Sequence, residues 1–313
     1  MASESSDCAD PIMDSVKEIE GLVSAVYGEL IDVLIETSDM VAAFQTRSVG
    51  TVVVGDRVTL ESIKVEEGEV GWRVAGLHKR EHCLWRSSRR HRSQLVVANV
   101  DRLCIVSALE PPPREGLIDR YLLAAEWQEI EPVILFNKMD LEGADDTFKR
   151  LAVYAAIGYE VIPTSAVTGA GIESVAGLLS RGLTVLVGHS GVGKSALLNR
   201  LLPEIDLKTA ELSQATGKGR HTTSVATAHP FHDGIVVDTP GIREFGLGNI
   251  PAEQVSTGFR EIYEREGRCR FADCSHRDEP GCSISEAVKE KEITQTRYDS
   301  YLRIRKSVET GES

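Results

Sequence analysis

The sequence predicts an α/β domain with a parallel sheet, preceded by a small all-β barrel or sandwich and followed by a short helical unit. Between Gly21 and about Arg80, short β-branched segments alternate with glycine-containing turns, which is typical of a small all-β fold. From about Gln94, apolar strands alternate with helical stretches, which predicts parallel strands covered by helices. After Pro251 the chain is charged, helix-like and contains a cysteine cluster.

Length and composition agree with this organisation. The chain has 313 residues, of which 42% are hydrophobic and 27% charged, as in ordinary folded proteins. We expect an acidic disordered tail over residues 1–20, an all-β domain over 21–92, an α/β domain over 93–250 and a helical domain over 251–313. No stretch approaches the roughly 18 apolar residues of a membrane helix, and the N-terminus lacks a signal-peptide pattern. We therefore expect a cytoplasmic protein with no membrane partner.

Charge is distributed unevenly along the chain, whose formal net charge is -13. Seven acidic residues and one lysine, Lys17, fall within the first thirty residues, which predicts the solvated tail. By contrast, residues 78–92 carry six Lys and Arg side chains against one acid, Glu81, with Trp85 among them. Such a basic segment is a candidate RNA contact, and the alternative is a basic interdomain linker. The sequence alone favours neither.

A phosphate-binding loop is predicted at residues 188–195, where GHSGVGKS follows the strand TVLV and precedes an apolar-periodic helix. Glycines let backbone N–H groups surround phosphates, Lys194 would reach the β- and γ-phosphates, and the Ser195 hydroxyl would bind Mg²⁺. The alternative, a glycine turn with an incidental lysine, is disfavoured by the position between strand and helix. We expect nucleotide contacts from Gly188, His189, Ser190, Gly191, Val192, Gly193, Lys194, Ser195 and Ala196, with Lys194 also acting in catalysis.

A second phosphate motif, DTPG, ends the predicted strand IVVD. Asp238 would therefore lie at the carboxyl edge of the sheet, able to hold Mg²⁺ directly or through water. Gly241 could offer its N–H to the γ-phosphate. Alone, this tetrapeptide is a weak signal, because a surface turn would have the same composition.

Two further loops follow predicted strands and favour guanine over adenine. NKMD resembles the guanine-recognition motif of GTPases: the Asp140 carboxylate can accept the ring N–H and the exocyclic amine of guanine, a pattern that adenine lacks. Asn137 would brace this loop, and the stem of Lys138 would lie along the base. The TSA loop, formed by Thr164, Ser165 and Ala166, would place a backbone N–H at the base O6. Each loop alone could be a surface turn, but together with the P-loop they indicate a guanine-nucleotide site.

The motifs occur in a rotated order, because the guanine loops precede the P-loop instead of following it. A closed α/β domain tolerates such a circular permutation when a linker joins the usual termini, and IESVAGLLSRG is suited to that role. The chain then leaves the domain directly after DTPG, the segment that senses the γ-phosphate. Whatever follows Gly241 is therefore attached to that switch.

A candidate metal site lies in the C-terminal unit, where Cys269, Cys274, His276 and Cys282 form C-x4-C-x-H-x5-C. Three thiolates and one imidazole suit a closed tetrahedral structural zinc site. The alternative is a pair of buried thiols with a surface histidine. Disulfides are not expected in a cytoplasmic chain.

The catalytic glutamine of Ras-like GTPases is missing, because Ile242 stands directly after DTPG. The segment GKGRHTT, between the P-loop and DTPG, offers replacements. Thr222 or Thr223 would complete the Mg²⁺ shell, and His221 would reach the γ-phosphate region on the same loop. Without a family match, the favoured interpretation of His221 would be an exposed loop histidine.

These motifs together resemble the circularly permuted GTPases of small ribosomal subunit biogenesis, the RsgA (YjeQ) family. The similarity spans nearly all of residues 21–305 and includes VGDRV, LIDRYLLAAE, GRHTT, DTPGIREFGL and CRFADCSHRDEPGC. It implies an N-terminal OB-fold barrel, a permuted GTPase domain and a C-terminal zinc domain. It also implies hydrolysis stimulated by the small subunit, rRNA binding through the flanking domains, and a water-positioning role for His221.

The predicted function is hydrolysis of GTP to GDP and phosphate with Mg²⁺ by a monomeric assembly factor of the small ribosomal subunit. Its partners would be GTP or GDP and the small subunit with its rRNA. The alternative is a nucleotide-gated RNA-binding scaffold in which hydrolysis is incidental, and Ile242 favours it. A GTPase of tRNA or membrane traffic is disfavoured, because the flanking domains suit RNA and the chain lacks a lipidation signal.

Overall fold

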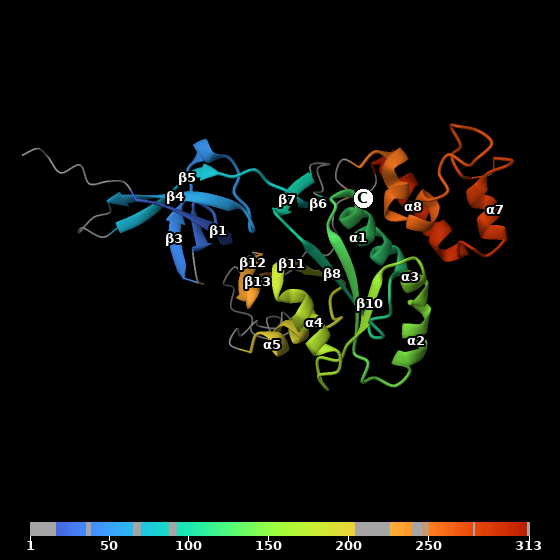
Figure 1. Cartoon of the computed structure of the whole chain (residues 1–313), viewed down its shortest axis with the longest axis horizontal. Coiled ribbons are helices and arrows are strands. Elements are labelled where there is room, and N and C mark those ends of the chain that lie inside the picture. The colour runs from blue at the N-terminus through green and yellow to red at the C-terminus, as the bar shows by residue number, and fades with distance from the viewer. Residues whose placement is uncertain are drawn as a thin grey trace, which may run out of the picture.

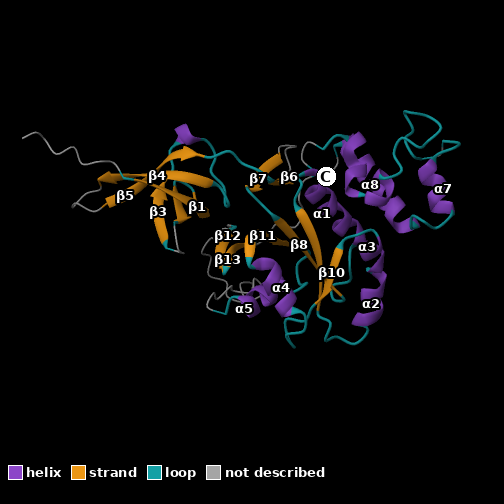
Figure 2. Ribbon diagram, viewed as in Figure 1, coloured by secondary structure: helices purple, strands orange, loops and turns teal. Residues whose placement is uncertain are grey.

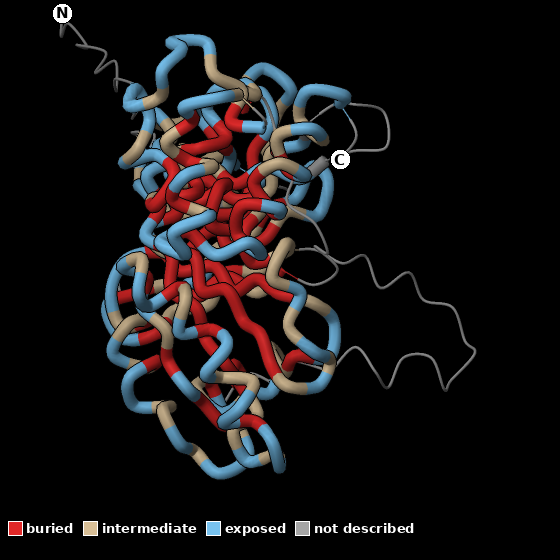
Figure 3. The backbone as a smooth tube through the Cα atoms, turned by 90° about the vertical axis from the view of Figure 1, so that its right-hand side faces the viewer, coloured by how far each residue is buried: buried red, intermediate tan, exposed pale blue. Residues whose placement is uncertain are grey.

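The computed structural model describes residues 17–35, 39–64, 70–87, 93–203, 226–239, 247, 250–277 and 279–311. Three units follow one another along the long axis: a β-barrel, a mixed sheet with helices, and a helical unit that packs beside helix α1 (Figure 1). Figure 3 shows that buried residues are concentrated in the interior of the molecule, whereas exposed segments lie around them. The fold class predicted from the sequence is confirmed.

The N-terminal unit is a closed barrel with strand order β1-β2-β3-β5-β4. That order of five strands is the OB-fold arrangement. Val23, Ile31, Val58 and Leu60 are fully buried inside it. The strands are β1 (Glu18–Tyr27), β2 (Leu30–Leu34), β3 (Met40–Phe44), β4 (Arg57–Lys64) and β5 (Val70–Leu77), with a short 3-10 helix η2 (Arg47–Val49) after β3.

The first strand begins inside the segment expected as a disordered tail. Glu18 pairs with Glu61 and Ile19 with Leu60, and the Lys17 N–H donates to Ser62 Oγ at 2.9 Å. Pairing with β4 therefore orders residues 17–20 despite their acidic composition. The remaining residues of that tail, 1–16, lie outside the described part of the chain.

A two-stranded hairpin, β6 (Leu84–Ser87) and β7 (Ser93–Val97), joins the barrel to the sheet. The expected domain boundary at residues 92 and 93 falls between these paired strands and stays a prediction. Val54 of the barrel forms a parallel bridge with Val97, and the Ala98 N–H donates to Val54 O at 3.0 Å. The hairpin is therefore held against the barrel by backbone hydrogen bonds.

The central sheet has strand order β10-β9-β8-β11-β13-β12. Every pairing is parallel except that of β12 with β13, which form an antiparallel hairpin. Because the other strands are parallel, their carboxyl ends meet at one edge. The strands are β8 (Arg102–Ala108), β9 (Glu131–Asn137), β10 (Glu160–Pro163), β11 (Arg181–Val187), β12 (Thr227–Phe231) and β13 (Asp233–Asp238).

Helices cover both faces of this sheet (Figure 2). On one face lie α1 (Glu115–Trp127), α2 (Ala144–Arg150) and α3 (Ala152–Ala156), which pack Tyr121 and Tyr154 against Ile105 and Ile134. On the other lie α4 (Ile172–Leu179) and α5 (Lys194–Leu201). Helix α4 joins β10 to β11, so the expected linker between the guanine loops and the P-loop strand is a helix packed on the sheet.

The C-terminal unit contains η5 (Ala252–Gly258), α6 (Arg260–Tyr263), α7 (Ser283–Lys289) and α8 (Gln295–Thr310). Its apolar core includes Phe259 and Tyr301, and Leu123 of α1 belongs to the same cluster. A Cβ placed on Gly258 would lie 2.5 Å from the Leu123 Cα, so only glycine allows this approach. Among the described residues, none of the helices combines the length and apolar character needed to cross a membrane.

A buried ion network fastens the C-terminal unit to the sheet domain. Arg297 of α8 is 2% exposed and donates to Asp119 of α1 and, at 2.7 Å, to Glu261 of α6. The Tyr154 hydroxyl donates to the same Asp119 at 2.9 Å, and the guanidinium lies 4.3 Å from the Phe259 ring centroid. Breaking one side of such a buried pair leaves an uncompensated charge in the interior.

We expect Arg297→Met to lower the free energy of unfolding by about 3–5 kcal/mol, because Asp119 and Glu261 would lose their shared counter-charge. Urea denaturation followed by circular dichroism measures this change. The control is Arg303→Met on the same helix, whose exposed guanidinium bonds only a carbonyl of its own helix at 3.3 Å among the described contacts. Equal stability of the two variants would contradict the prediction.

Candidate nucleotide and metal sites

The loop between β11 and α5 has the backbone of a phosphate cradle. Gly188, Gly191 and Gly193 have φ angles of 144°, 84° and 96°, which side chains disfavour. A Cβ on Gly188 would lie 2.2 Å from Val106 O of the neighbouring strand. The loop can therefore adopt this curve only with glycine at these positions, and its N–H groups are left to face a ligand at the helix start.

Lys194 and Asp238 lie near each other where β11 and β13 end. The Lys194 ammonium donates to Gly188 O at 2.7 Å and to His189 O at 3.1 Å. Burial lowers the pKa of Lys194, and the Asp238 carboxylate opposes that shift. Burial likewise raises the pKa of Asp238, and Lys194 opposes it. Two partly desolvated opposite charges thus stand beside the phosphate cradle, where they act strongly on a phosphate or a Mg²⁺ ion.

Asn137, at the end of β9, joins the P-loop to both guanine loops. Its side chain is 1% exposed, and Nδ2 donates to Val192 O at 3.0 Å. Its Oδ1 accepts from the Ala166 N–H at 3.2 Å and the Thr164 hydroxyl at 3.4 Å. A Cβ on Gly193 would lie 2.3 Å from Nδ2. One buried amide therefore fixes the spacing of all three loops.

The two guanine loops also bond directly to each other. The Met139 N–H donates to Thr164 O at 3.0 Å, and the Ser165 hydroxyl donates to Asp140 Oδ1. The left-handed backbone at Lys138, with φ 65°, turns the chain sharply after the strand. Asp140 is thus held by the loop that would contact the base O6. The Asp140 carboxylate and the backbone N–H of that loop can therefore bind the same guanine base.

A proline turn after β8 also belongs to this site, although no functional role was predicted for it. The Lys138 ammonium donates to Glu110 O at 2.6 Å, and a Cβ on Gly191 would lie 3.5 Å from Pro111 Cδ. Pro112 and Arg114 line a small cavity with Gly188 and His189. The position of the turn could have indicated this role, because its three prolines begin three residues after the end of a strand that leads to the ligand edge of the sheet.

Four predicted site residues, His221, Thr222, Thr223 and Gly241, lie outside the described part of the chain. The other predicted nucleotide-site residues lie at or directly after the ends of β9, β10, β11 and β13, at the carboxyl edge of the sheet, with Ser195 and Ala196 in the first turn of α5. The assignment of individual nucleotide contacts stays a prediction.

The predicted metal ligands meet in the C-terminal unit. The ligand atoms of Cys269, Cys274, His276 and Cys282 all lie within 4.8 Å of one another. Cys269 Sγ is 4.0 Å from Cys282 Sγ and 3.5 Å from His276 Nδ1. Around a tetrahedral ion with metal–sulfur bonds of about 2.3 Å, sulfur atoms are about 3.8 Å apart. Burial lowers the pKa of His276, which keeps the imidazole in its neutral, metal-binding form.

Comparison with known proteins decides the family. The family model described as RsgA GTPase matches residues 77–248. The chain belongs to the RsgA GTPase family. It is therefore a guanine-nucleotide-binding enzyme that hydrolyses GTP, and the family predicted from the motifs is confirmed.

Curated relatives of the family extend beyond the GTPase domain. The small ribosomal subunit biogenesis GTPase RsgA of Haemophilus influenzae strain PittGG is 37% identical over 298 residues, 94% of this chain and 86% of that protein. The protein of the same name from Photorhabdus laumondii is 39% identical, over 93% of this chain and 85% of that protein. The similarity to these GTPases thus includes the barrel and the C-terminal unit.

Solved structures agree with the fold. The crystal structure of YjeQ from Thermotoga maritima has a TM-score of 0.73 and 30% identity, covering 93% of this chain and 99% of that one. The structure of YloQ, described as a circularly permuted GTPase, has a TM-score of 0.70 and 25% identity, covering 97% and 99%. The rotated motif order of this RsgA-family GTPase is therefore a circular permutation of the domain.

The basic segment after the barrel divides into structural and exposed parts. Arg80 donates to both carboxylate oxygens of the fully buried Asp56, at 2.6 and 2.8 Å, and so braces the VGDRV turn. Arg86 is exposed and donates a hydrogen bond to Gln94 Oε1 at 2.7 Å. Because Gln94 is neutral, this contact does not compensate the positive charge of Arg86. Trp85 is 37% exposed beside it. Residues 88–92 of the segment lie outside the described residues.

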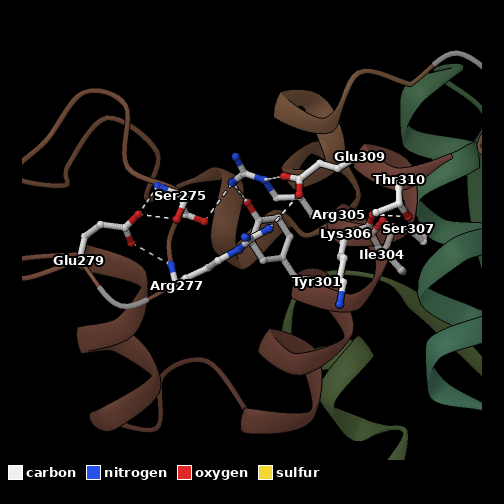
Figure 4. A network of polar contacts seen from close by, with 10 residues as sticks. All are labelled: Ser275, Arg277, Glu279, Tyr301, Ile304, Arg305, Lys306, Ser307, Glu309 and Thr310. Carbon is white, nitrogen blue, oxygen red and sulfur yellow. Dashed lines mark hydrogen bonds and ion pairs between the residues drawn. The ribbon is translucent and has the colours of Figure 1, made fainter. Parts of the chain in front are cut away.

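A polar network around the metal-binding loop was not predicted from the sequence (Figure 4). Glu279 accepts from the Ser275 hydroxyl, from the Ser275 N–H at 2.8 Å and from the Arg277 N–H at 2.9 Å. These hydrogen bonds, that of the hydroxyl above all, lower the pKa of Glu279 to about 2. The Tyr298 hydroxyl donates to His276 O at 2.6 Å, where the backbone has a φ of 62°. Arg305 donates to Ser275 O at 3.0 Å. These contacts shape the loop that presents Cys274 and His276.

We expect Glu279→Gln to weaken metal binding about 10- to 100-fold, because an amide nitrogen cannot accept one of the two backbone N–H bonds. Competition with a chromogenic zinc chelator measures the affinity. The matched control is Glu290→Gln, an exposed change on the turn after α7. Wild-type affinity in Glu279→Gln would contradict a positioning role for this carboxylate.

Proposed function

We propose that this GTPase hydrolyses GTP to GDP and phosphate with Mg²⁺ during assembly of the small ribosomal subunit. The observation that carries the proposal is the Asn137 side chain, which connects the P-loop to both guanine loops in one site. The relatives from Haemophilus influenzae and Photorhabdus laumondii are named for small ribosomal subunit biogenesis. Their similarity over the flanking units supports the same partner here.

Different residues would bind the phosphate oxygens and the Mg²⁺ ion. Lys194 moves from its carbonyl partners to the β- and γ-phosphates, and the P-loop N–H groups from residues 188–195 surround the same oxygens. Ser195, Asp238 and one of Thr222 and Thr223 would hold Mg²⁺, which neutralises charge on the phosphates when bound. The Gly241 N–H would contact the γ-phosphate.

Guanine selection is assigned to Asp140, with Asn137 and Lys138 supporting the loop and Thr164, Ser165 and Ala166 facing the base O6. The Ser165 hydroxyl orients the Asp140 carboxylate and still leaves acceptor positions on its two oxygens. Those positions match the two N–H donors of guanine. A carboxylate would be repelled by the ring nitrogen lone pair of adenine at the same place.

Asp140→Asn should weaken GTP binding by about 10-fold or more and allow xanthosine nucleotides to bind, because an amide can donate to the O2 of xanthine. Titration with fluorescent GTP and XTP analogues measures both affinities. Asp145→Asn, an exposed change on α2, serves as the control. Unchanged preference for GTP in Asp140→Asn would refute the assignment.

The water-positioning residue is proposed to be His221, on the grounds of family resemblance and because Ile242 cannot orient water. Slow hydrolysis alone and faster hydrolysis on the small subunit would follow if contact with the subunit places this histidine beside the attacking water. A second candidate function, a nucleotide-gated RNA-binding scaffold, is favoured by Ile242. Single-turnover hydrolysis with and without small subunits separates the two.

His221→Ala should reduce subunit-stimulated turnover by about 100-fold while leaving GTP affinity unchanged, because the side chain would act only on the attacking water. Single-turnover rates on purified small subunits test this, with nucleotide affinity measured in parallel. The control is His232→Ala, at the turn between β12 and β13. Equal subunit-stimulated rates for His221→Ala and the wild type would contradict the water-positioning role of His221.

The Cys269, Cys274, His276 and Cys282 site is proposed to hold one structural Zn²⁺, since three thiolates and one imidazole match its preferred ligands. We propose that the chain works as a cytoplasmic monomer, with domain boundaries near residues 92 and 250. Cosedimentation with small and large subunits, in GDP or a non-hydrolysable GTP analogue, tests the partner. Binding to the small subunit only with the GTP analogue is the expected result.

A further inference from the structure

We propose that the cleft between the barrel and the β6–β7 hairpin binds one unpaired nucleotide of RNA. This inference rests on the proposed function, because it assumes an RNA partner. It assigns a ligand to a site that lies outside the GTP-binding loops. The nucleotide base would enter the cleft, and its phosphates would stay at the charged mouth.

The cleft has a volume of about 480 Å³, within the range of small-molecule sites. One wall is the barrel segment that runs from the end of β3 through η2 to Val54, and the other is β7 with Arg86 of β6. Val26 of β1, Glu29 of the β1–β2 turn and Ala226 complete it. The cleft thus lies between two elements that are far apart in sequence.

Both walls are held in place by contacts of the described residues. Val54 bridges Val97 at one end of the cleft, and Asn99 Nδ2 donates to Gly55 O at 2.8 Å. Arg80 fixes the Val53 turn through Asp56, whose Oδ2 accepts from the Val53 N–H at 2.8 Å. The opening is therefore preformed, which lowers the entropic cost of binding.

The lining suits a nucleobase. Apolar surface from the half-buried Val26, Leu95 and Val96 can cover the faces of a flat ring. Side-chain amides and hydroxyls stand around it and can bond the edges of a base; these are Gln45, Thr46, Thr51 and Gln94. A base within a duplex has its faces stacked and its edges paired, so only an unpaired base can use both kinds of contact.

The charge at the mouth favours a phosphate backbone. Arg47 and Arg86 both line the cleft, and both side chains are exposed. Within the described residues Arg47 forms no side-chain hydrogen bond or ion pair, and Arg86 bonds only the neutral Gln94. Among the described residues that line the cleft, Glu29 is the only acid. Two available guanidinium groups at one opening suit the phosphates on either side of a bound nucleotide.

An exposed apolar row next to the cleft gives flanking bases a surface to stack on. Register places Tyr27 opposite Leu30 and Leu30 opposite Phe44 on the outer side of the barrel. Their exposed fractions are 51%, 38% and 49%. The neighbours of these residues, Glu29 and Gln45, line the cleft itself. Aromatic side chains beside a basic opening are the usual elements of single-stranded RNA binding.

The proposal is tested with the full chain, a fluorescein-labelled single-stranded RNA of mixed sequence and the same RNA as a duplex. Thr51→Trp fills the cleft from an exposed position and should weaken single-strand binding about 10-fold or more, as should Arg47→Glu. Arg57→Glu is the matched control, because it reverses another exposed arginine of the barrel outside the cleft. GTP affinity should not change in any variant.

A second measurement locates the RNA. Single-stranded RNA that contains 4-thiouridine is cross-linked to the wild type, and the modified peptide is identified by mass spectrometry. Cross-links within residues 45–54 or 94–96 support the proposal, and cross-links elsewhere alone overturn it. Wild-type affinity in Thr51→Trp, equal losses in Arg47→Glu and Arg57→Glu, or a preference for duplex would each overturn it as well.

Failure of the inference and failure of the proposed function give different results. If wild-type protein cosediments with small subunits in the GTP analogue but Thr51→Trp does so equally well and binds single strands normally, only the cleft assignment is wrong. If the wild type binds neither single-stranded RNA nor small subunits, both are overturned. Stimulated GTP hydrolysis by Thr51→Trp at saturating subunits should remain within about twofold of wild type, since the site acts in binding.

Discussion

The nucleotide site depends on one buried amide. Asn137 donates to the P-loop at Val192 and accepts from Thr164 and Ala166, so three loops from three strands have a fixed spacing. Its nitrogen also occupies the space that a Cβ at Gly193 would need. Asn137 at the guanine end of the site therefore requires a glycine at position 193 at the phosphate end. Circular permutation leaves these contacts unchanged, because they depend on which strands are adjacent and not on their order along the chain.

Helix α1 connects the nucleotide site to the metal-binding unit. Arg114 precedes its first turn and lines a cavity with the P-loop, whereas Asp119 and Leu123 further along are buried in the C-terminal interface. Arg260 adds an ion pair to Glu126 at 2.7 Å near the end of the same helix. The C-terminal unit is thus attached to the GTPase domain by packing as well as by the chain that follows DTPG. Sequence reasoning identified only the second of these connections.

The elements that could be predicted were those with strong local signals. The P-loop, the guanine loops and the four metal ligands each follow a short pattern, and the strands before them are continuous apolar runs. The roles of Glu110 and Arg297 depend on distant residues: Lys138 is 28 positions from Glu110, and Asp119 is 178 positions from Arg297. No local sequence pattern indicates such contacts. Composition alone also misassigned Lys17–Glu20, because strand pairing with β4 outweighs their acidic character.

The barrel has a further consequence for the sheet beside it. β12 is the edge strand of the central sheet, and β1 of the barrel packs next to it, while Pro230 interrupts its hydrogen-bonding pattern. Edge strands with open backbone groups recruit strands from other molecules. In a GTPase domain separated from its barrel, this edge would lose the cover of β1, and the missing N–H of Pro230 would be left to limit pairing with another chain. The barrel thus also serves as a cover for the edge of the neighbouring sheet.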